Sequence, residues 1–256
     1  MNHIFVNRDR MSDDKRSVTV TGAEAHHLIH VLRIRVDEEF SVSLADETDM
    51  AQYRYSVVEI RDDAVIGELR FIKEADVELP SSIVLFQGLP KSDKMELIVQ
   101  KAVELGAASI IPMKTKRSVV RLDEARAAKK VYRWQEIASA AAAQSRRSIL
   151  PTVENVMTVA EAATYASHLD VVLFPYELAL EDDPDALRRT GELLRSIKPG
   201  QTIGIIIGPE GGWTPEEAQM LRNAGAHTIS LGHRILRTET AGLTVLSWLI
   251  LQLEII

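Results

Sequence analysis

The 256-residue chain contains no cysteine, which excludes disulfide bonds and thiolate metal sites. Long apolar runs are also missing. Residues 1–8 lack the apolar core of a signal peptide, and the apolar stretch near the C-terminus is too short and too interrupted to cross a bilayer. These absences predict a soluble, cytoplasmic protein without a membrane partner.

Two nucleotide-binding motifs are absent as well. A Rossmann domain would carry Gly-x-Gly-x-x-Gly after its first strand, but residues 87–94 contain a single glycine. The Gly-x-x-x-x-Gly-Lys-Ser/Thr motif of P-loop nucleotidases does not occur either. A Rossmann enzyme and a P-loop nucleotidase are therefore disfavoured.

The net charge of −7 argues by itself against a nucleic-acid partner, but the charge is unevenly distributed. Residues 114–147 hold ten basic and three acidic side chains, so this stretch carries +7 and the rest of the chain −14. Between residues 123 and 133, the basic side chains are equally well explained as the solvent-exposed face of a helix. The basic clusters at 117–121 and 146–147 flank expected helix ends, where contact with phosphate is more plausible.

The first 77 residues have the alternating pattern of short strands. Strands are expected at residues 17–21, 40–44, 53–60 and 65–72. Residues 22–33 interrupt them with a helix that carries Leu28, Val31 and Leu32 at helical spacing, so these three side chains are expected to pack on a small barrel. Its three histidines have no matching carboxylate or cysteine cluster, and no metal site is expected.

The pattern changes after Pro80, and strands then alternate with helices. Strands are expected at 83–87, 108–112, near 153, at 171–174, 203–207 and 227–231. Helices are expected at 93–105, 123–145, from Thr158, from Pro184, from Thr214 and at 241–256. This alternation predicts an α/β domain with a parallel sheet, and the boundary divides the chain into domains at 1–77 and 78–256.

Two loops near the C-terminus have the composition of a ligand site. Gly208-Pro209-Glu210-Gly211-Gly212 follows a buried strand, and its glycines allow the backbone to approach a ligand closely. Taken alone, this loop is equally explained as a tight turn between a strand and a helix. The second loop, residues 231–241, places two arginines, a glutamate and two threonines beyond a strand's carboxyl end, where open α/β sheets bind ligands.

This pair of loops resembles the cofactor loops of the SPOUT methyltransferases, and specifically the RsmE family, which methylates N3 of a uridine in 16S ribosomal RNA. Segments along nearly the whole chain share the resemblance: His26-His27-Leu28, Leu89-Pro90-Lys91, residues 101–106, Arg117-Ser118, residues 133–135 and residues 144–151. One position departs from the family, since Ala140 stands where a glutamate is common. The resemblance implies a SPOUT domain with a trefoil knot, preceded by a PUA-like β-barrel that helps to bind RNA.

The implied cofactor is S-adenosylmethionine, with S-adenosylhomocysteine as product and no metal. The residues expected at the cofactor are Phe174, Pro175, Tyr176, Gly208, Pro209, Glu210, Gly211, Gly212, Leu231, Gly232, Ile235, Leu236, Arg237, Thr238, Thr240 and Ala241. The residues expected at the RNA are Arg33, Arg35, Lys91, Arg117, Arg121, Arg146 and Arg147. The apolar C-terminal helix is either buried core or the interface of a homodimer, and the family implies the latter in part.

The chemistry requires that the N3 proton be removed or the uracil anion be stabilised. Arg237 supplies a fixed cation and Glu239 the nearest carboxylate, although Glu239 serves equally well as an acceptor that ties down its own loop. Two other functions remain open: a related SPOUT enzyme acting on transfer RNA, and a non-catalytic RNA-binding protein. The His-His-Leu segment disfavours the transfer RNA enzyme, and the intact second loop disfavours the non-catalytic protein.

Overall fold

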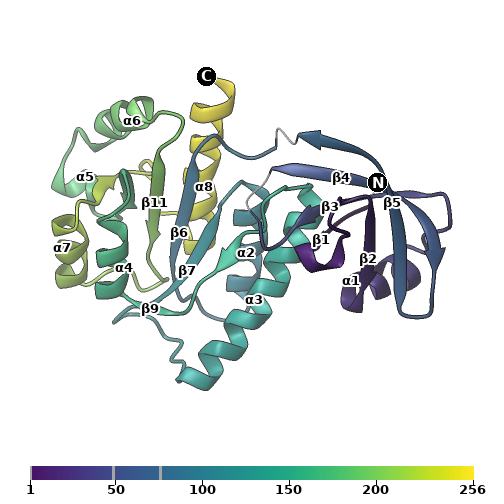
Figure 1. Ribbon diagram of the computed structural model, residues 1–256. Helices are drawn as coiled ribbons and strands as arrows, with labels where there is room; N and C mark the ends of the chain where they lie inside the picture. Colours follow the sequence, from purple (N-terminus) through teal and green to yellow (C-terminus); the bar gives the residue numbers. More distant parts are fainter. Residues whose placement is uncertain (1, 48–49, 75–76) are drawn as a thin grey trace. The chain divides into compact units, whose positions relative to one another are not determined.

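The computed structural model describes residues 2–47, 50–74 and 77–256 (Figure 1). The chain forms two compact units, one of Met1–Glu78 with Ser139–Leu150 and one of Leu79–Ala138 with Pro151–Ile256. In these described ranges, no helix is both long enough and apolar enough to cross a membrane. The domain boundary expected after residue 77 stays a prediction.

The first unit is built on a five-stranded sheet. Its strands are β1 (Asn2–Val6), β2 (Ser17–Thr21), β3 (Glu39–Leu44), β4 (Ala51–Ile60) and β5 (Ala64–Glu74). Their order is β1-β3-β4-β5-β2, with β1 parallel to β3 and the other pairs antiparallel. The four strands expected from the alternating pattern are confirmed, whereas β1 was not anticipated.

The helix of the first unit buries fewer of its apolar side chains than expected. A turn η1 (Arg8–Arg10) precedes β2, and α1 (Gly22–His26) follows it and continues as the π-helical turn η2 (His27–Val31). Leu28 is fully buried as expected, but Val31 is 60% exposed and Leu32 39% exposed. A π turn holds more residues than an α turn and changes the phase of the apolar pattern, so the prediction that these two side chains pack inward was wrong.

The second unit contains a wholly parallel sheet, as the alternation of strands and helices predicted. Its strands are β6 (Ser82–Gly88), β7 (Ser109–Lys114), β8 (Thr152–Val153), β9 (Met157–Thr158), β10 (Val171–Pro175), β11 (Thr202–Ile207) and β12 (His227–Ile229). Their order is β12-β10-β11-β6-β7-β8, and β9 also pairs with β7. The last strand ends two residues before the predicted position.

Two of the helices begin at the capping residues that the sequence predicted. They are α2 (Lys94–Glu104), α3 (Glu124–Ser145), α4 (Val159–Ala166), α5 (Ala179–Asp182), α6 (Ala186–Ser196), α7 (Pro215–Asn223), α8 (Thr238–Ile250) and the π turn η3 (Leu251–Ile255). Thr158 and Thr214 each form the predicted capping box with the glutamate three residues on. Asp93 precedes α2 without a side-chain cap, α5 was not anticipated, and α8 begins three residues earlier than expected.

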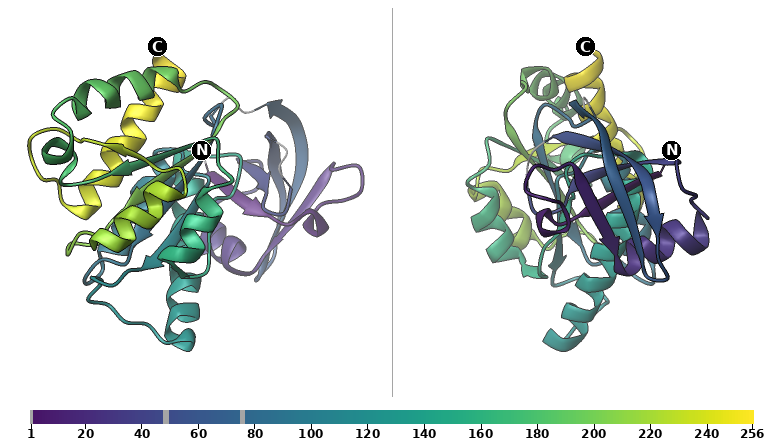
Figure 2. Two further views of the ribbon diagram at one scale, coloured as in Figure 1. Left: turned by 90° about the vertical axis from the view of Figure 1, so that its left-hand side faces the viewer. Right: turned by 45° about the vertical axis from the view of Figure 1, so that its right-hand side comes forward.

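Helices cover both faces of the parallel sheet (Figure 1, Figure 2). On one face, Phe86 and Ile206 pack with alanines of α4 and with Leu221 of α7. On the other face, Gly242 of α8 lies over Leu85 and Ile207, and α8 also packs against α2. Because the central strands β6, β7 and β11 are buried, loops at the strand ends are the part of the sheet that can meet a ligand.

Candidate functional site

Four parallel strands end together at one edge of the second unit's sheet. Register pairs Gln87 of β6 with Ile207 of β11, and Pro175 of β10 with Ile229 of β12. The segments that follow these strands include both glycine-containing loops predicted as a ligand site, and β10 ends at Phe174 and Pro175, which were also expected at the cofactor. Carboxyl ends of parallel strands are where open α/β sheets bind their ligands.

The first loop, residues 208–212, is held against the end of β6. A Cβ on Gly88 would lie 2.7 Å from the backbone nitrogen of Pro209, so only glycine permits this approach. The Gly212 amide donates to the Pro209 carbonyl at 3.0 Å, and Arg117 Nη1 donates to the Gly211 carbonyl at 3.2 Å. The loop is therefore a fixed turn with its backbone close to neighbouring segments.

Thr238 joins the two loops. Its hydroxyl donates to the Gly208 carbonyl at 2.6 Å and accepts from Gln87 Nε2 at 2.9 Å, and the residue is only 7% exposed. Because α8 begins at Thr238, Glu239 and Thr240 occupy its first turn and are not part of a free loop. The bonds of Thr238 fix the distance between the second loop and the first.

The rest of the second loop is more open. Ile235 is 87% exposed, Arg237 is exposed at the N-cap of α8, and Leu236 is half-buried. A Cβ on Gly232, whose φ is +105°, would meet nothing within 4 Å. The backbone at this glycine therefore borders open space at the edge of the sheet.

A lysine that the sequence analysis did not select bridges both loops. Lys94 Nζ lies 3.1 Å from Glu210 Oε1 of the first loop and 3.2 Å from Glu239 Oε2 of α8. These hydrogen bonds raise the pKa of Lys94. Burial opposes ionisation of Glu210, but bonds from its own backbone amide, Lys94 and Lys91 outweigh it and lower the pKa of that carboxyl. Glu239 is thus engaged in an ion pair, which favours its role in holding the loop.

A sequence signal for Lys94 does exist. The first turn of a helix normally favours acidic side chains, because the helix dipole is positive there. A lysine at the first position of α2, directly after a strand's carboxyl end, therefore indicates a specific acidic partner. Gln87 and Gly88 gave no such signal, since their roles depend on segments more than 100 residues away.

The three residues of segment 174–176 that were expected at the cofactor are only partly available to a ligand. Phe174 is fully buried and belongs to the hydrophobic core, where it packs edge-on against Trp213 at a centroid distance of 5.5 Å. Its side chain therefore cannot contact a cofactor, which corrects that prediction. Pro175 and Tyr176 are half-buried. The Tyr176 ring stacks on Phe174, and the Arg222 guanidinium carbon lies 4.8 Å from the Tyr176 ring centroid.

The basic residues predicted to contact RNA are distributed over both units. In the second unit, Lys91, Arg117 and Arg121 are exposed, and the first two lie against the first loop through Glu210 and Gly211. In the first unit, exposed side chains belong to Arg33, Arg35 and Arg146.

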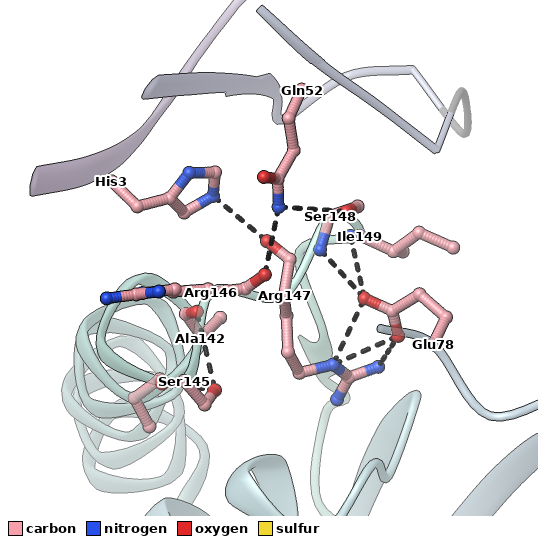
Figure 3. A network of polar contacts seen from close by, with 10 residues as sticks. His3, Gln52, Glu78, Ala142, Ser145, Arg146, Arg147, Ser148 and Ile149 are labelled. Carbon is pink, nitrogen blue, oxygen red and sulfur yellow. Dashed lines mark hydrogen bonds and ion pairs between the residues drawn. The ribbon is translucent and has the colours of Figure 1, made fainter. Parts of the chain in front are cut away.

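The prediction that Arg147 contacts RNA was wrong. It is 4% exposed, and its Nη2 lies 2.6 Å from Glu78 Oε2 (Figure 3). A guanidinium buried against a carboxylate has no access to a phosphate, so Arg147 is structural.

Comparison with known proteins defines the class of this chain. The family model for the RNA methyltransferase domain matches residues 77–250, and the chain belongs to this RNA methyltransferase family. Ribosomal RNA small subunit methyltransferase E of Bacillus subtilis (strain 168) is 33% identical over 244 residues, which cover 95% of this chain and 93% of the relative. The protein of the same name from Mycobacterium tuberculosis (strain CDC 1551 / Oshkosh) is 33% identical over 245 residues, 93% of this chain and 87% of the relative.

Solved structures show the same fold. A crystal structure of ribosomal RNA small subunit methyltransferase E from Neisseria gonorrhoeae, bound to S-adenosyl methionine, matches with a TM-score of 0.78 and 28% identity. The match covers 98% of this chain and 97% of that one. The α/β fold with a parallel sheet is therefore that of the RsmE-type SPOUT methyltransferases, as the resemblance of the two loops predicted.

Proposed function

We propose that this protein is an S-adenosylmethionine-dependent methyltransferase that methylates N3 of a uridine in the 16S ribosomal RNA of the small ribosomal subunit. The observation that carries the proposal is the joining of both glycine-containing loops by Thr238 at one sheet edge. The family membership and relatives that match along nearly their full length, one of them bound to S-adenosyl methionine, support it.

The residues at this edge fit the cofactor. Open space beside Gly232 and the exposed side chain of Ile235 provide an apolar, backbone-lined border for an adenosine moiety. The glycines of the first loop allow Trp213, Arg117 and Glu177 to pack against it without a clash, which holds the loop at the same edge. When bound, S-adenosylmethionine supplies a methyl group activated by its own sulfonium charge, so the protein has to bind, orient and exclude water.

The substrate nitrogen carries a proton at neutral pH, and the protein has to favour its loss. Arg237 is exposed at the N-cap of α8, at the end of the second loop, and has no ion pair within the described part of the chain. It is therefore available to stabilise the uracil anion. Glu239 is paired with Lys94, so we assign it a role in holding the loop and not in proton transfer.

Further features of the family belong to the same proposal. We infer a trefoil knot in the second unit, supported by the insertion of β11 between β10 and β6, and a PUA-like barrel from the five strands of the first unit. A homodimer through the C-terminal helix is supported by exposed Leu251, Ile255 and Ile256. The proposed RNA contacts are Arg33, Arg35, Lys91, Arg117, Arg121 and Arg146.

Mass mapping of methylated 16S ribosomal RNA from cells with and without this gene tests the function. We expect one methyl group on N3 of a uridine to disappear with the gene and to return with the wild-type gene but not with Arg237→Ala. An unchanged 16S map, or a missing methyl group on transfer RNA instead, would contradict the proposal.

A further inference from the structure

The segment that follows α3 is held inside the first unit by a buried polar cluster (Figure 3). The Glu78 carboxylate accepts hydrogen bonds from the Arg147 guanidinium and from the backbone amides of Ser148 at 2.8 Å and Ile149 at 3.1 Å. Because Glu78 and Arg147 are almost wholly buried, this ion pair fixes the segment firmly.

Two residues of the first unit's sheet hold the same segment from the other side. His3 Nε2 donates to the Arg147 carbonyl at 2.9 Å, and its Nδ1 lies 2.8 Å from the Ser41 hydroxyl. Gln52 Nε2 donates to the Arg146 carbonyl at 3.0 Å and to the Ser148 hydroxyl at 3.2 Å. Figure 3 shows His3 and Gln52 directed at this backbone, His3 from β1 and Gln52 from β4. The backbone of Arg146 is therefore set by its neighbours.

Arg146 itself has an unusual conformation. Its φ is +60°, in the left-handed region that favours glycine. Its amide donates to the Ala143 carbonyl at 3.2 Å, and the Arg147 amide donates to the Ala142 carbonyl at 2.9 Å, which is the Schellman pattern at the end of α3. Glycine is the usual residue at this position, so an exposed arginine here points to a function of its side chain.

Other cations lie on the face of the sheet that meets this turn. Residues directly opposite one another on neighbouring strands share a face, and one such row crosses β1, β3, β4 and β5. The row consists of His3, Ser41, Arg54 and Phe71. The adjacent pair on β4 and β5 is Gln52 and Lys73. Cations and an aromatic ring thus continue from the turn at Arg146 across β4 and β5.

The exposed part of this face has the composition of a single-stranded RNA platform. Phe71 is 49% exposed, Lys73 and Arg146 are exposed, and the Arg54 guanidinium carbon lies 5.4 Å from the Phe71 ring centroid. Exposed rings stack bases without sequence preference, and cations beside them neutralise the phosphates. Glu74, the nearest acid along β5, pairs with Ala51 and belongs to the opposite face.

We propose that Arg54, Phe71, Lys73 and Arg146, named here the β4–β5 face, bind a single-stranded segment of the substrate RNA. Phe71 stacks on a base, and the three cations contact phosphates. The buried cluster around Glu78 acts as a positioning device that holds Arg146 at the edge of this face. The inference rests on the proposed function for the identity of the RNA, but its binding test does not depend on catalysis.

The first test compares two neighbouring residues on opposite faces of β5. We expect Phe71→Ala to weaken binding of protein-free 16S ribosomal RNA, measured by filter binding, by about tenfold, within the range found when one stacked base is lost. Ile72→Ala is the control, because Ile72 is 54% exposed but faces the other way. Lys73→Gln should lower the slope of log affinity against log salt by about 0.7. Equal affinities for all three variants and the wild type would overturn the proposal.

The second test uses the strained turn. Arg146→Gly should leave the melting temperature unchanged or raise it, since glycine suits a positive φ, and should still weaken RNA binding severalfold. Arg146→Lys should retain most of the affinity. A lower melting temperature for Arg146→Gly with unchanged RNA affinity would make the arginine a structural part of the turn and overturn the assignment.

Activity measurements separate this inference from the proposed function. With small subunits as substrate, Phe71→Ala should raise KM while the single-turnover rate at saturating substrate stays close to wild type. A wild-type protein that binds RNA through this face but methylates no RNA would contradict the proposed function alone. Variants that lose affinity for assembled subunits but not for protein-free RNA would show that the face binds a ribosomal protein, and the RNA assignment would then be wrong.

Discussion

Arg147→Met is the substitution that best separates a structural arginine from a substrate contact. Both Arg146 and Arg147 were predicted to contact RNA, yet Arg146 is exposed whereas Arg147 is 4% exposed and paired with Glu78. Methionine has a similar volume but no charge. The variant therefore leaves the Glu78 carboxylate buried with the amides of Ser148 and Ile149 as remaining donors.

The expected loss of stability is large. Removing one partner of a buried, hydrogen-bonded ion pair costs about 3–5 kcal/mol, because the other charge stays buried without compensation. For a chain of this size, each kcal/mol corresponds to a shift in melting temperature of about 2–4 °C, so we expect a decrease of about 10 °C. The double variant Arg147→Met with Glu78→Gln should recover part of this loss, since no buried charge is left.

Thermal unfolding followed by circular dichroism measures the effect, with Arg146→Met as the matched control. We expect the control to change stability by less than about 0.5 kcal/mol, as for most exposed positions. If Arg147→Met melted within about 2 °C of the wild type while its RNA affinity fell with a smaller salt slope, Arg147 would be a phosphate contact and the reasoning from burial would be refuted.

Three further predictions concern single side chains. Burial lowers the pKa of His3 from 6.5 to about 4, so the unfolded state binds more protons than the folded state between these pH values. The free energy of unfolding should therefore fall by about 3 kcal/mol as the pH decreases from 6.5 to 4. Denaturant titrations should show a weaker pH dependence of stability for His3→Gln. Lys94→Met should lower S-adenosylmethionine affinity at least severalfold in calorimetry, because it removes the cation that joins Glu239 to the carboxylate of the first loop. Lys101→Met in the same helix is the control and should leave the affinity unchanged. Equal cofactor affinities for Lys94→Met and the wild type would exclude a role for the bridge. Arg237→Ala should reduce single-turnover methyl transfer by about two to three orders of magnitude with cofactor affinity nearly unchanged, and Arg237→Lys should also be impaired; a near-normal rate would make this arginine a loop-structuring residue.

Much of the second unit could be predicted because its signals are local. Capping boxes at Thr158 and Thr214 involve residues three positions apart, so the sequence suffices to place the helix starts. Buried parallel strands appear as short apolar runs, and loops after them must lie at one edge of the sheet. The two candidate cofactor loops were found for this reason, and the family followed from their resemblance.

What the sequence by itself determined was therefore the class of fold, the starts of the two helices with capping boxes and the place of the candidate site. Tertiary structure alone decided which side chains meet there: Lys94 reaches Glu239 across 145 positions of the chain, and Thr238 reaches Gly208 only because their segments end at neighbouring places on the sheet. It also decided that Phe174 belongs to the core and that Arg147 is buried while Arg146 is exposed. Local propensity is fixed by neighbours within a few residues, whereas burial and charge pairing depend on strand order and register, which bring distant segments together.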